Sequence, residues 1–480
     1  MLANPTQPVL PLPLGPEPFP QGLPHHPEDD PFHALEHSLA SLSLTTSLDA
    51  VPPPFQHPPT LPPSLSENPN PTPNPALTST SPIPITTALF PPGDNVVFAH
   101  SSYFRRNRVL HRDLDLPAPE QVRQQAVAWG ATLLPPPKEP GLPGREGERE
   151  SEGEGGAGAG GGGDHGYAVA MVEDARLLVP FPELGLLVRY GRRVDAGLEG
   201  KVMGMVRRAL LAAGLRMPVA DSSIPRMGGA GAQMEVGQVV PEVFGWRKDG
   251  ATGDGCLYMN SFGEGRWHRL DLIWAGLSDR EKERIAGEVR EVVRGWRRLT
   301  LAGTARPFVG NVDNGPLQDE IFRGCAGAGM MAPGPFASVS AFHKYFVETA
   351  VASSHRRMNQ TGPASRWSPH SPQHLLPDDV PIVFTHGGLH PRNIFVSPDP
   401  IPHVVAILGW EQAGWYPAYW ELCKARLDCA RHGGIGDWET LYLSQILDAE
   451  DLGWQLRGRW NVNALCQYWG YFVAMMTGRS

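Results

Sequence analysis

Proline crowds the first 93 residues of this chain and limits what they can fold into. The segment contains the runs LPLPLGPEPFP, VPPPFQHPPTLPPSL and NPNPTPNPALTSTSPIPI. The few apolar side chains between the prolines cannot offset the entropy lost when such a backbone is ordered. We therefore predict a disordered, partly polyproline II tail over residues 1–93. This tail is either passive or a ligand for protein partners such as SH3 or WW domains.

The composition of the chain excludes some classes of function. The net charge of -9 argues against a dedicated nucleic-acid binder, because neutralising phosphates needs a concentrated basic surface. No run approaches the roughly 18 apolar residues of a membrane span. The five cysteines include no C-x-x-C pair and suit a reducing compartment, where most act as small buried hydrophobes. We predict a cytoplasmic protein with small-molecule or protein partners.

The order of secondary-structure patterns predicts an α+β fold with two lobes. Residues 94–265 contain strand-like runs and one packed helix, interrupted at about 135–166 by a Gly- and Glu-rich, flexible insertion. Residues 266–480 are mostly helical. The clearest helix follows Ser278, which forms a capping box with Glu281. A small strand-rich lobe followed by a larger helical lobe is the order of a protein-kinase-like fold.

One stretch, FTHGGLHPRNIFV, carries the pattern of a phosphotransfer catalytic loop. The template is H-x-D-x-x-x-x-N, in which the aspartate orients the acceptor hydroxyl and the asparagine holds magnesium. Here His386 opens the loop and Asn393 closes it, but Gly388 replaces the aspartate. A later apolar strand leads to Gly409, where a second, metal-binding aspartate is expected. Both carboxylates are missing.

These motifs resemble the aminoglycoside phosphotransferase (APH) family of the protein-kinase-like superfamily, which includes choline kinases. THGGLHPRNI is similar to T-H-G-D-L-H-P-x-N-I, and ILGWEQAGWYPAYWE to I-I-D-W-E-x-x-G-W-Y-P-x-Y-W-E. The resemblance extends from about Asp94 to the C-terminus through weaker matches such as VPEVFGWRKDG and GNVDNGPLQD. It implies a two-lobed kinase-like fold, ATP and Mg²⁺ as cofactors, and a small-molecule acceptor of unknown identity.

The resemblance also implies a nucleotide site in the first lobe. Arg189 stands where the family has its phosphate-binding lysine, and Glu199 stands at the position of its partner glutamate. The interlobe hinge that meets an adenine ring would be formed by the backbone of Tyr258, Met259, Asn260 and Ser261.

In the second lobe, the resemblance makes Asn393 a magnesium ligand, Gly388 the vacated base position and Gly409 the vacated second ligand position. His386 is interpreted as a brace of the loop. Glu411 is either a substitute metal ligand or a structural member of the W-E pair. We expect that aspartates placed at both glycine positions together raise nucleotide and magnesium affinity more than either one alone.

Three functions remain open on sequence grounds. The first is a pseudoenzyme that keeps the phosphotransferase scaffold, in which binding of ATP and Mg²⁺ is weakened or lost. The second is an active ATP-dependent small-molecule phosphotransferase with altered metal ligation. The third is a non-catalytic interaction scaffold that recruits partners through the proline-rich tail.

Overall fold

The computed structural model describes thirteen segments of the chain, all of them within the compact unit Thr72–Ser480. These segments are residues 81–85, 90–107, 114–129, 177–192, 194–218, 233–262, 267–302, 306–323, 331–361, 376–398, 401–431, 436–448 and 462–478. The predicted insertion at about 135–166 and most of the predicted tail lie outside the described residues.

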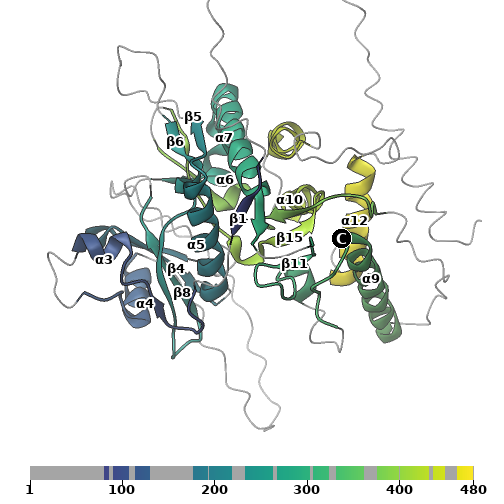
Figure 1. The fold of residues 1–480 in the computed structure, drawn as a ribbon, viewed down its shortest axis with the longest axis horizontal. Coiled ribbons are helices and arrows are strands. Elements are labelled where there is room, and N and C mark those ends of the chain that lie inside the picture. The colour runs from purple at the N-terminus through teal and green to yellow at the C-terminus, as the bar shows by residue number, and fades with distance from the viewer. Residues whose placement is uncertain are drawn as a thin grey trace, which may run out of the picture. The chain divides into compact units, whose positions relative to one another are not determined.

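A five-stranded antiparallel sheet organises the first part of the described chain (Figure 1). Its order is β2 (Val96–Val97), β7 (Val243–Lys248), β8 (Gly255–Asn260), β4 (Leu186–Gly191) and β3 (Leu177–Phe181). Around this sheet and after it lie four short elements: helices α3 (Ser102–Asn107) and α4 (Pro119–Ala128), and the paired strands β5 (Arg216–Pro218) and β6 (Gln233–Glu235).

The alternation of side chains along β4 decides which of them reaches the functional site. Successive residues of a strand point to opposite faces of the sheet. Leu186 and Val188 pack in the apolar cluster beside α3 and α4, whereas Leu187 joins the main core on the other face. Arg189 therefore points, like Leu187, toward helix α5 (Ala196–Ala212).

Glycine lets α5 approach the sheet closely. A Cβ at Gly200 would lie 2.8 Å from the Trp246 ring and 2.9 Å from Leu257 Cδ1. Because these neighbours belong to β7 and β8, any larger residue at this position would push the helix away from the sheet. The glycine thus brings the adjacent Glu199 within reach of Arg189.

Two three-stranded sheets carry the loop motifs in the second part. One has the order β14 (Val404–Ile407), β13 (Ile394–Val396) and β9 (His268–Arg269). The other has the order β11 (Gly310–Asn311), β15 (Gly414–Pro417) and β12 (Ile382–Thr385). The catalytic-type loop connects β12 to β13, and Gly409 follows β14.

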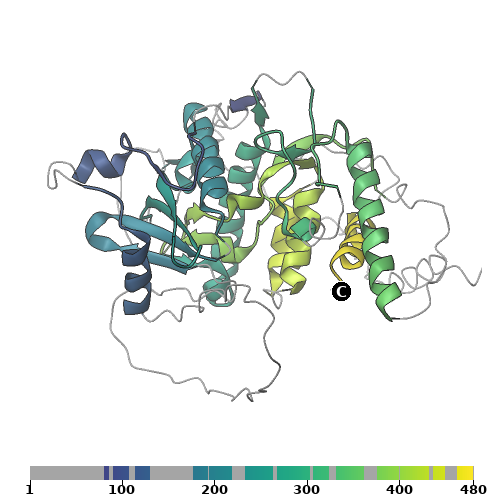
Figure 2. The same cartoon turned by 90° about the horizontal axis from the view of Figure 1, so that it is seen from below.

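Helices supply most of the remaining core. They are α6 (Leu270–Ile273), α7 (Asp279–Arg297), α9 (Val339–Thr361), α10 (Trp420–Arg431), α11 (Leu443–Ile446) and α12 (Val462–Thr477). In both views α9, α10 and α12 lie together on the side away from α3 and α4 (Figures 1 and 2). The predicted α+β class is confirmed, and α7 begins at the predicted capping box of Ser278 and Glu281. Among the described helices, none is long and apolar enough to cross a membrane.

A short strand lies inside the segment for which we predicted disorder. Strand β1 (Ile83–Ile85) pairs in parallel with β10 (Leu299–Leu301), and its two isoleucines are buried. Pro84 is tolerated because β1 lies at the edge of a two-stranded sheet. Ordered structure therefore starts before residue 94, and the predicted boundary of the tail is too late for these residues.

Candidate functional site

Strand β4 and helix α5 place the predicted phosphate-binding position beside its partner. Arg189 Nη1 donates to Glu199 Oε1, and the two side chains are 5% and 1% exposed. The same glutamate oxygen accepts from the backbone N–H of Gly409 at 2.9 Å. The ion pair therefore extends to the backbone of Gly409, the position predicted for the second metal ligand.

His386 is a buried, neutral side chain in the loop. Its Nδ1 accepts from Gly388 N at 3.1 Å. Its Nε2 lies 3.2 Å from Leu408 O and must carry the proton, since a carbonyl can only accept. The ring packs against Trp296 and Trp410 at centroid distances of 5.6 and 4.4 Å. Burial lowers the pKa of His386 to about 4, so the side chain orders the loop without charge at neutral pH.

Asn393 lies beside both Gly388 and Gly409, the two positions at which the motif predicts carboxylates. Its Nδ2 donates to Gly388 O at 2.8 Å. A Cβ built on Gly409 would lie 2.7 Å from the same Nδ2, and the φ of Gly409 is 90°. A Cβ on Gly388 would meet Asn393 Nδ2 only at 3.4 Å, an ordinary van der Waals distance. The backbone at Gly388 can thus accept a side chain, whereas Gly409 occupies a conformation that favours glycine.

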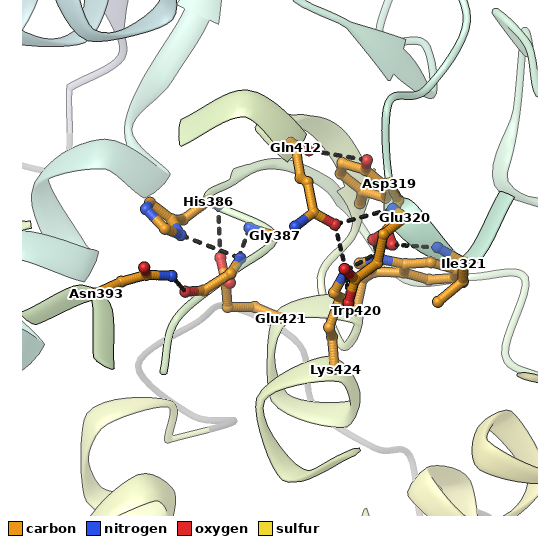
Figure 3. Close-up of polar contacts among 12 residues, drawn as sticks. Asp319, Glu320, Ile321, His386, Gly387, Asn393, Gln412, Trp420, Glu421 and Lys424 are labelled. Carbon is orange, nitrogen blue, oxygen red and sulfur yellow. Dashed lines mark hydrogen bonds and ion pairs between the residues drawn. The ribbon is translucent and has the colours of Figure 1, made fainter. Parts of the chain in front are cut away.

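Glu421 holds the beginning of the loop in place (Figure 3). Its two carboxylate oxygens accept from His386 N at 2.6 Å and from Gly387 N at 3.0 Å, and its side chain is fully buried. Burial raises the pKa of Glu421, while Arg297 and the two N–H donors favour its ionised form. The sequence motifs alone assign this residue no role, although it is the last residue of the motif ILGWEQAGWYPAYWE.

A buried ion pair lies beside this brace (Figure 3). Lys424 Nζ donates to Asp319 Oδ1 at 2.6 Å and to Gln412 Oε1 at 2.5 Å. Trp420 Nε1 donates to the other oxygen of Asp319 at 3.0 Å. Burial would lower the pKa of Lys424, but the negative charge of Asp319 raises it. Asp319 ends the quoted motif GNVDNGPLQD, yet only the fold brings this residue to Lys424.

The family model "Phosphotransferase enzyme family" (APH) matches residues 218–455. The match contains the loop from His386 to Asn393, the Gly409 position, and the Glu421 brace. This part of the chain belongs to the phosphotransferase enzyme family. Arg189 and Glu199 lie before the matched residues. The resemblance given by the sequence motifs is thus confirmed.

Solved aminoglycoside phosphotransferases are among the similar structures. A thermostable mutant of APH(4)-Ia in its apo form shares 17% identity, with a TM-score of 0.28, over 63% of this chain and 90% of the other. APH(3'')-Id from Streptomyces rimosus shares 14%, with a TM-score of 0.32 and the same two coverages. Another APH(4)-Ia structure, a ternary complex with AMP-PNP and hygromycin B, shares 16%, with a TM-score of 0.27, over 61% and 87%. No curated protein matches the sequence.

The predicted hinge lies at the end of β8, within the matched residues. Tyr258 and Met259 are fully buried and pair with β4 and β7 on either side. Asn260 N donates to Glu242 O at 2.9 Å, and Ser261 N donates to Gly185 O at 3.1 Å. The backbone donors at the end of the strand are therefore engaged within the protein.

The three residues at the predicted base and magnesium positions offer few of the ligands that Mg²⁺ prefers. Mg²⁺ prefers oxygen ligands, usually including one or two carboxylates, in near-octahedral geometry. Gly388 and Gly409 offer no side-chain oxygen, and Asn393 directs its amide nitrogen to Gly388 O. Within the described ranges, no group of three or more His, Cys, Asp or Glu side chains could hold a metal.

Glu288, on α7, makes stability depend on pH near the strand that leads to Gly409. It accepts from Val404 N at 2.6 Å, and burial raises its pKa to about 7 despite this donor, which lowers it. Between its ordinary value of 4.5 and about 7, the folded protein holds a proton that the unfolded chain has lost. This group's contribution to stability therefore falls as pH rises through this window.

We expect Glu288→Gln to reduce the loss of unfolding free energy between pH 5 and pH 8 by about 1–3 kcal/mol. The amide can still accept from Val404 N but does not ionise. Chemical denaturation at the two pH values measures the difference. Glu291→Gln on the same helix is the matched control and should leave the pH dependence as in the wild type. An unchanged pH dependence in Glu288→Gln would contradict the assignment.

Proposed function

We propose that this chain is a pseudoenzyme of the phosphotransferase family, which keeps the scaffold and has lost efficient phosphoryl transfer. The proposal rests on one observation: glycines stand at the two positions, on either side of the Asn393 amide, where the motif has carboxylates. Gly388 and Gly409 flank Asn393, whose Nδ2 donates to the loop backbone at 2.8 Å. No side chain at these positions can orient an acceptor hydroxyl or hold a metal ion.

The charged groups beside these positions support the same proposal because the guanidinium of Arg189 is already paired. Arg189 is paired with Glu199, and Glu411 Oε2 lies 3.7 Å from Arg189 Nη1. The backbone N–H groups of Gly409 and Trp410 also donate to Glu199 Oε1, at 2.9 and 3.4 Å. A phosphate group would have to compete with these buried contacts for the guanidinium of Arg189.

The expected loss of rate is large. A general base contributes about 10² to 10⁴ in rate, which corresponds to about 3–5 kcal/mol of barrier. The loss of a metal-binding carboxylate adds to this, because phosphoryl transfer depends on neutralising the charge of the phosphates. Arginine in place of lysine keeps a positive charge, but its planar guanidinium group is not equivalent to a compact ammonium group.

We expect ATP and ADP, with or without Mg²⁺, to leave the melting temperature of the full chain unchanged. A ligand at a hundredfold excess over its Kd would stabilise the protein by about 2.7 kcal/mol, which thermal denaturation detects readily. Arg189→Lys is a useful companion, since it restores the family's residue while keeping the charge. A magnesium-dependent shift in the wild type, together with transfer of labelled phosphate to any acceptor, would overturn the proposal.

An active phosphotransferase with altered metal ligation is the second candidate, and the position of Glu411 favours it. This carboxylate is 3% exposed, follows Gly409 closely in sequence and lies beside Arg189. Under this alternative, magnesium-dependent nucleotide binding should be measurable and should weaken in Glu411→Gln and in Asn393→Ala. If binding is detected and neither variant changes it, Glu411 has no role in metal ligation.

A further inference from the structure

Two cysteine sulfurs face each other between the helices α10 and α12. Cys423 Sγ on α10 and Cys466 Sγ on α12 are 3.1 Å apart. Three residues further along α10, Arg426 Nη1 donates at 2.8 Å to Asn463 Oδ1, which lies three residues earlier on α12. The two helices therefore run antiparallel here, and a polar contact fixes their register at the thiol pair.

The two thiols differ in exposure and acidity. Cys423 is fully buried, whereas Cys466 is half-buried. The hydrogen bond from Cys423 lowers the pKa of Cys466, and Arg426 adds to this effect. Burial raises the pKa of Cys423. The less buried of the two cysteines is thus the one with more thiolate character, which is the arrangement of an attacking and a resolving cysteine.

Two other cysteines among the described residues have a different environment. Cys256 and Cys429 are fully buried, and burial raises the pKa of each to about 12. These two thiols match our prediction of small buried hydrophobes. The pair on α10 and α12 does not, because Cys466 is only partly buried and its pKa is lowered.

We propose that Cys423 and Cys466 form a reversible oxidation site, which a peroxide converts to a disulfide between α10 and α12. The Cys466 thiolate attacks one oxygen of the peroxide; an S–O bond forms, the O–O bond breaks, and the leaving hydroxide takes a proton to become water. Cys423 then loses its proton and attacks the Cys466 sulfur. The S–S bond forms, the S–O bond breaks, and a second water leaves. The two sulfurs together lose two electrons, and the peroxide gains them.

The disulfide would connect the C-terminal helix to the helix that holds the loop. Glu421, which accepts from the loop backbone, and Lys424, which pairs with Asp319, flank Cys423 on α10. Oxidation therefore links α12 covalently to α10, the helix whose Glu421 supports the loop at His386. This inference does not depend on whether the loop binds nucleotide.

The test treats the reduced full chain with hydrogen peroxide and maps peptides without reducing agent. We expect a crosslink between the Cys423 and Cys466 peptides, an intact mass lower by two hydrogens, and a melting temperature raised by several degrees because a loop is closed in the unfolded chain. In Cys423→Ser, dimedone should trap a sulfenic acid at Cys466. In Cys466→Ser, oxidation at Cys423 should be about tenfold slower.

Cys429→Ser on the same helix is the matched control and should form the crosslink at the wild-type rate. Thermal denaturation verifies that each variant is folded; if a serine variant does not fold, the crosslink in the wild-type chain decides the question. The proposal is overturned if the native protein forms no Cys423–Cys466 crosslink, if the crosslink forms only after denaturation, or if dimedone labels Cys429 as readily as Cys466.

Discussion

Lys424→Met should destabilise the protein by about 3–5 kcal/mol, one of the largest effects that we expect from a single substitution. The side chains of Lys424 and Asp319 are 1% and 0% exposed, and their charged atoms are 2.6 Å apart. Methionine fills much of the same volume but leaves the Asp319 carboxylate without its buried cation. Trp420 Nε1 still donates to that carboxylate, although this neutral donor cannot replace the lost charge. Chemical denaturation measures the change.

The double variant Asp319→Asn with Lys424→Met tests whether the cost comes from the unpaired charge. It should recover part of the loss, because both charges are removed together. Lys248→Met is the exposed control, since its side chain is 58% exposed, and it should change stability by no more than about 0.5 kcal/mol. A loss below about 1 kcal/mol in Lys424→Met would mean that the ion pair contributes little.

Gly409→Ala should cost about 2–3 kcal/mol of unfolding free energy, whereas Gly388→Ala should cost less than about 1 kcal/mol. Gly409 has a φ of 90°, which strains any residue with a Cβ. The new Cβ would also lie 2.7 Å from Asn393 Nδ2, so this amide must give up its hydrogen bond to Gly388 O. At Gly388 the corresponding contact is 3.4 Å. Thermal and chemical denaturation of the two alanine variants measure the unfolding free energy lost at each position. Alanine adds a Cβ without adding a charge.

The same geometry changes the expected result of restoring the carboxylates. The sequence predicts that two aspartates together raise nucleotide and magnesium affinity more than either one alone. The structure instead favours Gly388→Asp as the variant that gains magnesium-dependent nucleotide affinity, with Gly409→Asp adding no further gain because it displaces Asn393. Isothermal titration of the three variants with ATP and Mg²⁺ distinguishes these outcomes. A double variant that binds more tightly than both singles would show that the Gly409 backbone accommodates the side chain.

Local signals were enough to predict several elements of the fold. The capping box at Ser278 fixed the start of α7, because a cap involves residues only a few positions apart. The motif that contains His386 and Asn393 was visible for the same reason. Strand β1 was not predicted, since proline dominates the surrounding sequence. Its stability comes from pairing with Leu299 and Leu301, which are distant in sequence.

The sequence by itself determined the family and placed glycine at positions 388 and 409, because both depend only on which residues occupy neighbouring positions in a motif. The tertiary structure alone decided which side chains surround these two glycines. Glu199 reaches the Gly409 backbone, Glu421 holds His386, and Cys423 faces Cys466 only after helices from different parts of the chain have packed. Hydrogen bonds and ion pairs act over a few ångströms. Whether such groups meet is therefore set by the packing of the fold and not by their separation in sequence.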